Sequence, residues 1–255
     1  LPIVVAGQIS AESHPEAIKA QTILARTYIC RQMEQMGLEE EIPESSLGLE
    51  KNRNNQMEPL WGTEIFPEYY SRFEKAARET EGVTLTWEGH FIDPLFTHTT
   101  TGFTRPGDEE HPYLASVSCV HDPEEEGFVQ EMIMQPEEAA KRVSAIPAGD
   151  GSFRTIPPEA FPEQVQIISR DEAGYALQLQ IGGFPFNGEE VRLALGLPSA
   201  CFELNRHGSD VRFSVRGRGH GWGLSQTEAQ ALAEDGWSAE AILEYFYTGI
   251  SFSSE

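Results

Sequence analysis

Three segments of this chain combine residue types that could bind or cleave a polar substrate. They are AGQISAESHPEAIKAQTILARTY at residues 6–28, FTHTTTGF at 96–103 and RGRGHGWGLSQTEA at 216–229. The third has a glycine at every second position from Gly217 to Gly223, which indicates a backbone that turns or approaches another group closely. Its order does not fit the glycine motifs that bind phosphate. A tight connection that leads to a helix cap at Ser225 is the alternative interpretation.

Several side chains in these segments could hold a polar ligand. His220 lies between glycines that leave its side chain uncrowded, and His98 precedes Thr99 and Thr100, whose hydroxyl groups can donate and accept hydrogen bonds. Structural histidines and a locally satisfied turn are the alternatives. Trp222 could offer an aromatic face to a ligand, although burial is the more common outcome for a tryptophan.

Three arginines are candidates for binding an acidic group of a ligand. Arg26 interrupts an apolar helical pattern, and its guanidinium could bind a carboxylate or form a structural ion pair. Arg216 and Arg218 are the other candidates. The chain has 41 acidic and 18 basic residues, a formal charge of -23, so positive charge for an anionic ligand must be supplied locally. The same charge disfavours nucleic acid as a partner.

A long helix is predicted to carry most of the first segment. Pro15 suits its first position and Gly37 its end. Ile18, Ala25, Ile29 and Met36 recur at spacings of seven, four and seven, which predicts one buried face.

The remaining predicted elements are shorter. The opening run LPIVVAG is strand-like, and alternating apolar residues predict a hairpin over 83–92 with its turn at Glu88-Gly89. Ser225 and Glu228 have the spacing of a capping box, which predicts a helix to about Glu234. The other predictions are helices over 67–80, 137–144 and from Ser238, strand pairs 165–169 with 175–181 and 202–204 with 211–215, and an irregular polar segment over 39–55.

The composition fits a folded protein with a hydrophobic core. Of the 255 residues, 39% are hydrophobic, which is enough for a substantial core. No apolar run approaches the roughly 20 residues that span a bilayer, and no leader is visible. Because the chain starts without Met, we expect a longer precursor, with any signal or membrane anchor upstream. Three distant cysteines, and no Cys or His over 39–60, disfavour a zinc site, and no cofactor is expected.

The three segments resemble, in order and spacing, the stage II sporulation protein D family, also called the SpoIID/LytB domain. That family has an opening strand with a catalytic Glu, followed by P-E-A-L-K-A-Q-A-x-A-A-R-T-Y, and residues 15–28 read PEAIKAQTILARTY. Its glycine motif resembles G-R-G-W-G-H-G-V-G-M-S-Q, and residues 215–226 read VRGRGHGWGLSQ. This places His220, Ser225 and Gln226 on their counterparts, while Val215 and Arg218 depart from the pattern.

The resemblance extends over nearly the whole chain. AARETEG followed by FTHTTTG is similar to the middle of the family, with His98 on its histidine, and residues 237–252 resemble its terminal helix. Residues 39–60 and 121–162 match least well.

The resemblance implies a lytic transglycosylase that acts on peptide-stripped peptidoglycan during engulfment in spore formation, outside the cytoplasm at the cell envelope. A carboxylic acid protonates the glycosidic oxygen, and the 6-hydroxyl of the sugar closes a 1,6-anhydro ring. Peptidoglycan glycan strands, and other engulfment proteins, are the implied partners.

The most consequential departure is Gln8, which lies seven residues before Pro15, where the family has its catalytic Glu. An amide cannot donate a carboxylic proton, so cleavage should be severely impaired. Gln8 is either an engineered Glu replacement or the mark of a natural relative that binds glycan without cutting it. Glu12 could replace the acid, although a charge near a helix N-terminus is the simpler interpretation.

We expect an α+β fold formed by residues 1–255 as one two-lobed domain. The long N-terminal helix and the C-terminal helices would pack on small antiparallel sheets around a cleft lined by Gln8 and the substrate-binding candidates: Arg26, His98, Thr99, Thr100, Arg216, His220, Ser225 and Gln226. A non-catalytic glycan-binding domain, or a scaffold in the sporulation complex, is the alternative function.

Overall fold

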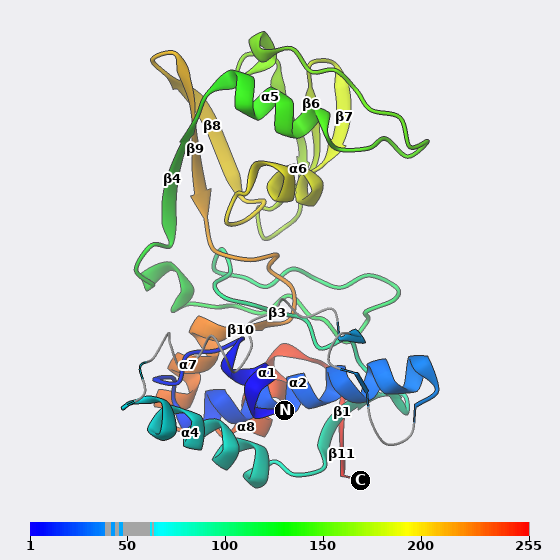
Figure 1. Ribbon diagram of the computed structural model, residues 1–255, viewed down its shortest axis with the longest axis vertical. Helices are drawn as coiled ribbons and strands as arrows, with labels where there is room; N and C mark the ends of the chain where they lie inside the picture. Colours follow the sequence, from blue (N-terminus) through cyan, green and yellow to red (C-terminus); the bar gives the residue numbers. More distant parts are fainter. Residues whose placement is uncertain (39–41, 44–45, 48–61, 63, 255) are drawn as a thin grey trace. The chain divides into compact units, whose positions relative to one another are not determined.

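The computed structural model describes residues 1–38, 42–43, 46–47, 62 and 64–254 (Figure 1). The irregular segment predicted over 39–55 lies largely outside them. Within the described part, seven α-helices accompany four small sheets, which confirms the α+β prediction. The chain divides into two compact units: unit 1 contains residues 1–96, 106–115 and 228–255, and unit 2 contains residues 97–105 and 116–227.

Helix α2 (Pro15–Met36) is the main element of unit 1 and has the predicted bounds. Its N-cap His14 accepts a hydrogen bond from the backbone of Glu16, and its C-cap Gly37 has a φ of 65°, a conformation that glycine adopts without strain. The helix packs against α4 (Phe66–Glu79), β1 (Val83–Trp87) and α8 (Ala239–Phe246). These contacts bury more than the one predicted stripe, although Met36, at the far end, is 46% exposed.

The predicted opening strand is wrong, because Pro2–Ala6 form the short helix α1. Val5 donates its backbone N–H to Leu1, and Gly7 donates to Ile3. Pro2 at the start suits a first helical turn. An apolar run this short fits either a strand or a helix, and here packing beside α2 and α4 selects the helix.

The predicted hairpin is confirmed as β1 and β2 (His90–Phe91), with positive φ values of 50° at Glu88 and 84° at Gly89. On its other side β1 pairs antiparallel with β11 (Ser251–Ser254). Leu85 is fully buried, and its N–H donates to the Thr27 hydroxyl on α2 at 2.9 Å. The hairpin is therefore fixed to the long helix.

Unit 2 contains two three-stranded antiparallel sheets, which Figure 1 shows with their helices. One has the order β4-β9-β8 and the other the order β5-β6-β7. Helices α5 (Pro136–Ser144) and α6 (Gly188–Leu195) contribute to the same core. The strands are β4 (Val129–Met134), β5 (Val165–Arg170), β6 (Ala176–Ile181), β7 (Phe184–Asn187), β8 (Phe202–His207) and β9 (Asp210–Arg216).

Both predicted strand pairs of unit 2 are confirmed. The sequence predictions had no counterpart for β4, β7 or α6. Helix α6 has a capping box in which the Asn187 side chain accepts from Glu189 and Glu190 accepts from the Asn187 backbone.

The last helices follow the C-terminal glycine segment. Strand β10 (Leu224–Ser225), which pairs with β3 (Phe96–Thr97), leads directly into α7 (Gln226–Glu234). Ser238 caps α8 by accepting from the N–H of Ala241, as predicted. Among the helices of the described residues, none is both long and apolar enough to cross a membrane.

Candidate functional site

Gln8 lies in unit 1, just after α1. Its backbone N–H donates to the carbonyl of Val5 at 2.9 Å, so the end of the helix positions the residue. Its side-chain Oε1 accepts a hydrogen bond of 2.9 Å from Nε2 of Gln21, which is fully buried on α2. Gln21 thus holds the Gln8 side chain from within the core. A carboxylate at position 8 could accept the same hydrogen bond.

Arg26 has a different environment in unit 1. Its guanidinium donates to the carbonyls of Val83 and Ala77, at 2.8 and 3.1 Å, and to the Thr80 hydroxyl at 3.1 Å. Burial lowers the pKa of Arg26. The three acceptors connect α2 to the end of α4 and the start of β1. This arrangement favours a structural role, through carbonyl groups instead of the ion pair considered from the sequence.

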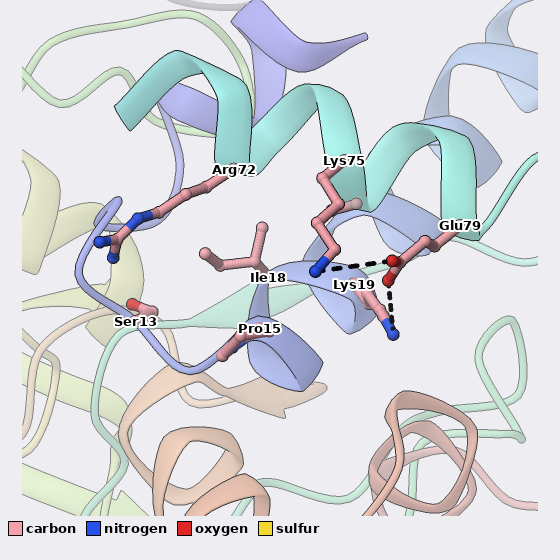
Figure 2. A pocket seen from close by; sticks show the side chains of 8 residues that line it. Ser13, Pro15, Ile18, Lys19, Arg72, Lys75 and Glu79 are labelled. Atoms are coloured by element: carbon pink, nitrogen blue, oxygen red, sulfur yellow. Dashed lines mark ion pairs between the residues drawn. The ribbon is translucent and has the colours of Figure 1, made fainter. Parts of the chain in front are cut away.

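A pocket of about 140 Å³ lies between α2 and α4, beside the loop that follows Gln8 (Figure 2). Its cations are Lys19, Arg72 and Lys75, and each has a carboxylate neighbour: Lys19 pairs with Glu16 and Glu79 at 2.8 Å, Arg72 with Glu68 at 3.1 Å, and Lys75 with Glu79 at 3.7 Å. Glu16 raises the pKa of Lys19 and so favours its charged form. The positive charge of this pocket is therefore largely neutralised within unit 1.

The glycine segment of unit 2 adopts the conformation that its composition predicts. All four glycines have positive φ: 74° at Gly217, 116° at Gly219, 86° at Gly221 and 71° at Gly223. A Cβ on Gly217 would lie 2.8 Å from the Thr100 carbonyl oxygen, and one on Gly221 would lie 2.5 Å from the Tyr175 hydroxyl oxygen. Glycine is thus required both for the turns and for close approach.

The threonine loop is held against this segment by backbone hydrogen bonds. Thr99 donates to the carbonyl of Arg218 at 3.0 Å, and Arg218 donates back to Thr99 at 2.8 Å. The Thr97 hydroxyl also donates to the Arg218 carbonyl, at 3.1 Å. The third segment and the second segment of the sequence therefore form one structure in unit 2.

A buried carboxylate that the sequence analysis missed, Asp122, lies behind the loop. It is fully buried and accepts from the backbone N–H of Thr100 at 2.5 Å and from the Ser225 hydroxyl at 2.8 Å. Thr99 is 2% exposed, and its hydroxyl lies 2.9 Å from that of Thr227. The arrangement makes Thr99, Thr100 and Ser225 internal supports, and it favours the interpretation of the loop as a satisfied turn. Asp122 falls where the resemblance is weak, so no motif marked it.

His98 is partly exposed on the same loop. Its Nδ1 lies 2.8 Å from the Thr99 hydroxyl, and its backbone carbonyl accepts from the Thr227 N–H at 3.1 Å. Burial, and then the positive charge of Arg218, lower the pKa of His98 below its usual value. A neutral imidazole at pH 7 leaves Nε2 able to take part in a hydrogen bond with a ligand.

His220 and Trp222 form a pair at the middle of the glycine segment. Their ring centroids are 5.6 Å apart, and His220 Nδ1 accepts a hydrogen bond of 3.1 Å from the backbone N–H of Trp222. An accepting Nδ1 places the proton of the neutral ring on Nε2. Both side chains are partly exposed.

Arg105, which carried no sequence signal beyond its place in FTRPG, supports this pair. It is 3% exposed and lies 3.7 Å from the Trp222 ring centroid. It pairs with Asp171 at 2.5 Å and with Glu189 at 3.1 Å, and it donates to the His220 carbonyl at 3.2 Å. A planar, multidentate cation thereby orients the segment, which a lysine could not reproduce.

The other candidates remain accessible in unit 2. Arg216 and Arg218 have exposed side chains, and Gln226, the first residue of α7, is partly exposed. Unit 2 therefore brings together His98, His220 and these polar groups, whereas Gln8 and Arg26 belong to unit 1. Within the residues that the structure covers, no three His, Cys, Asp or Glu side chains group closely enough to hold a metal ion.

The fold and these residues define an α+β protein in which a glycine-rich segment presents a His-Trp pair over a buried Arg. Comparison with known proteins then shows what the chain is similar to. Residues 1–87 match the family model described as stage II sporulation protein, SpoIID. This similarity confirms the resemblance to the stage II sporulation protein D family that was seen in the sequence.

Curated relatives extend the similarity beyond residue 87. Stage II sporulation protein D of Bacillus subtilis (strain 168) is 29% identical over 263 residues, and that of Bacillus amyloliquefaciens is 27% identical over 259 residues. Each alignment covers 98% of this chain and 72% of the relative. An amidase enhancer of Bacillus subtilis is 23% identical over 301 residues, covering 98% of this chain and 40% of the relative.

Proposed function

We propose that this protein acts on the bacterial cell wall during sporulation, by binding peptidoglycan glycan strands in a site of the lytic transglycosylase type. The observation that carries the proposal is the environment of Gln8, at the position where the family has its acid. The buried amide of Gln21 fixes the side chain at 2.9 Å, an arrangement suited to a catalytic carboxyl group. The relatives named stage II sporulation protein D support the sporulation context.

The reaction requires one group that gives and then takes back a proton. In the family chemistry, a carboxylic acid protonates the glycosidic oxygen, charge develops at the anomeric carbon, and the sugar 6-hydroxyl attacks that carbon while its proton returns to the carboxylate. Gln8 can donate a hydrogen bond from its amide but cannot release a proton. Loss of general acid catalysis typically costs about 10²–10⁴ in rate, so we expect binding with severely impaired cleavage.

The accessible groups of unit 2 would contribute to binding. His98 and His220 would hydrogen-bond sugar hydroxyls, Trp222 would offer an aromatic face, and Arg216 or Arg218 would pair with the carboxylate of a muramic sugar. Such a role places the protein outside the cytoplasm at the cell envelope, with glycan strands as its partner and other engulfment proteins as further candidates.

The test is mass spectrometry of products after incubation with peptide-stripped peptidoglycan glycan. We expect Gln8→Glu to release fragments with 1,6-anhydro ends at least about 10²-fold faster than the chain with Gln8, because it restores the acid. Gln166→Glu, which adds the same charge on an exposed part of β5, is the matched control and should release none.

Two results separate the alternatives. If neither Gln8→Glu nor the parent chain cleaves, while both retain glycan in a pull-down assay, the protein is a non-catalytic glycan-binding domain. If the parent chain itself cleaves, and Glu12→Gln abolishes that activity, then Glu12 is the acid. Glu12 accepts a hydrogen bond of 2.8 Å from the Tyr69 hydroxyl, an arrangement that fits a structural role better.

A further inference from the structure

Unit 2 contains a second pocket that the proposed function does not use. It has a volume of about 310 Å³, at the lower end of the roughly 300–1,000 Å³ that small-molecule sites occupy. Its walls come from the loop over residues 147–154, from β6 and β7, and from the first turn of α6. None of these segments contains a residue of the sequence-predicted site.

The polar groups of this pocket favour an uncharged ligand. The charged side chains that line it are Arg154 and Glu190, whose charges cancel. Gln178 and Asn187 supply amides, and they are direct partners in the β6–β7 register, so they lie next to each other across the strands. Amide groups both donate and accept, which suits hydroxyl and acetamido groups.

Apolar groups accompany these amides. Leu177 in the pocket is 39% exposed, and Phe184 on β7 is 41% exposed. Phe153, 68% exposed, is bridged to the pocket residue Pro147. Small-molecule sites are typically lined by hydrophobic and aromatic side chains together with a few polar groups. The combination suits a pyranose ring, which has apolar C–H faces and a polar edge.

An extended peptide fits this place less well. Strand β7 is at the edge of its sheet, where a peptide could add a strand. However, Pro185 on β7 has no N–H to offer, and its carbonyl already accepts from Arg154 Nη1 at 2.9 Å. The Arg154 guanidinium also lies 5.0 Å from the Phe186 ring centroid, which fixes its position. The edge is thus partly covered.

We propose that this pocket is a second saccharide site, which takes a neutral sugar unit of a glycan strand. The chemistry of the pocket requires only an uncharged sugar, and the choice of an N-acetylated amino sugar rests on the proposed function. A second contact on the same polymer raises the effective concentration of the strand at the first site, so it strengthens binding of long strands more than of short ones.

The test is an NMR titration of the ¹⁵N-labelled full chain with chitotetraose, an uncharged tetramer of N-acetylglucosamine. We expect shifts of the backbone amides at 148–154, 177–178 and 186–190. Gln178→Ala should weaken the affinity measured from these shifts by about fivefold, as loss of an uncharged hydrogen bond does. Gln166→Ala, an exposed glutamine on β5 outside the pocket, is the matched control and should change the affinity less than about twofold.

The same spectra separate this proposal from the proposed function. Shifts confined to residues around Gln8, His98 and His220 would overturn the second site and leave the first intact. Shifts confined to the pocket would support the second site and count against glycan binding by the first. Equal loss of affinity in Gln178→Ala and Gln166→Ala, or pocket shifts with tetra-alanine but not with chitotetraose, would overturn the saccharide proposal.

Discussion

Replacement of Gly221 by alanine should reveal how tightly the glycine segment is held in unit 2. Gly221 has a φ of 86°, where an L-residue other than glycine is strained by about 1–2 kcal/mol. The new Cβ would lie 2.5 Å from the Tyr175 hydroxyl oxygen and 2.8 Å from Cε2, which are closer than real Cβ contacts. Tyr175 is fully buried and lies against Arg105, 4.8 Å from ring centroid to Cζ, so it has little room to move.

The clash of the added Cβ with Tyr175 lowers the unfolding free energy further. Overpacking of a rigid interior typically costs about 1–3 kcal/mol, so the total loss of unfolding free energy for Gly221→Ala should be about 2–5 kcal/mol. Gly208→Ala is the control, because Gly208 has a φ of 63° and no atom within 4 Å of its added Cβ. It should therefore cost only the backbone strain of about 1–2 kcal/mol.

Urea denaturation followed by circular dichroism measures both values. In a Tyr175→Ala background the clash is absent, so Gly221→Ala should then cost about as much as Gly208→Ala does. Equal costs for Gly221→Ala and Gly208→Ala in the parent chain would refute the close approach of the segment to Tyr175.

Two further predictions concern the threonine loop. Asp122→Ala removes the buried carboxylate that accepts from the N–H of Thr100 and from the hydroxyl of Ser225. It should therefore lower the unfolding free energy by at least about 1–3 kcal/mol. A loss below about 0.5 kcal/mol in urea denaturation would contradict this role of Asp122. His98 has a lowered pKa because of its burial and of Arg218, so an NMR titration of its ring should give a midpoint below its ordinary value of 6.5. The stability that His98 contributes is then complete above pH 6.5 and is lost as the pH falls through the folded pKa. His98→Gln should therefore reduce the dependence of the unfolding free energy on pH in this range. A titration midpoint at or above 6.5 would exclude the lowered pKa.

Strong local signals account for the elements that the sequence predicts correctly. Pro15 and Gly37 set the bounds of α2, and the pair Glu88-Gly89 sets the hairpin turn. Each depends on backbone preferences within a few residues, which tertiary contacts here reinforce.

The missed and wrong elements lack such local signals. The first residues are all apolar, so the spacing of apolar side chains does not distinguish a strand from a helix. Packing against α2 and α4 selects the helix α1. Strand β4 was missed because its partner, β9, lies far along the chain. No pattern within residues 129–134 indicates that pairing.

The candidate site shows the same limit. Residue type and motif order identified Gln8, His98 and His220, but their supports come from elsewhere in the fold. Gln21 is an ordinary helical glutamine in the sequence, Asp122 begins a short 3-10 helix, and Arg105 lies in a loop. Only the structure shows that they form hydrogen bonds with Gln8, with Thr100 of the threonine loop and with the His220 carbonyl.

The interleaved make-up of the two units has a consequence for folding during synthesis. Strand β1 pairs with β11 through residues 169 apart in sequence, and α2 packs on α8, so unit 1 must wait for its last segment before its core closes. Unit 2 is nearly continuous, from residue 116 to residue 227, and can complete its sheets earlier. A ribosome or a secretion channel would therefore release α2 with its apolar faces uncovered, and a chaperone that binds this helix would be most valuable during that interval.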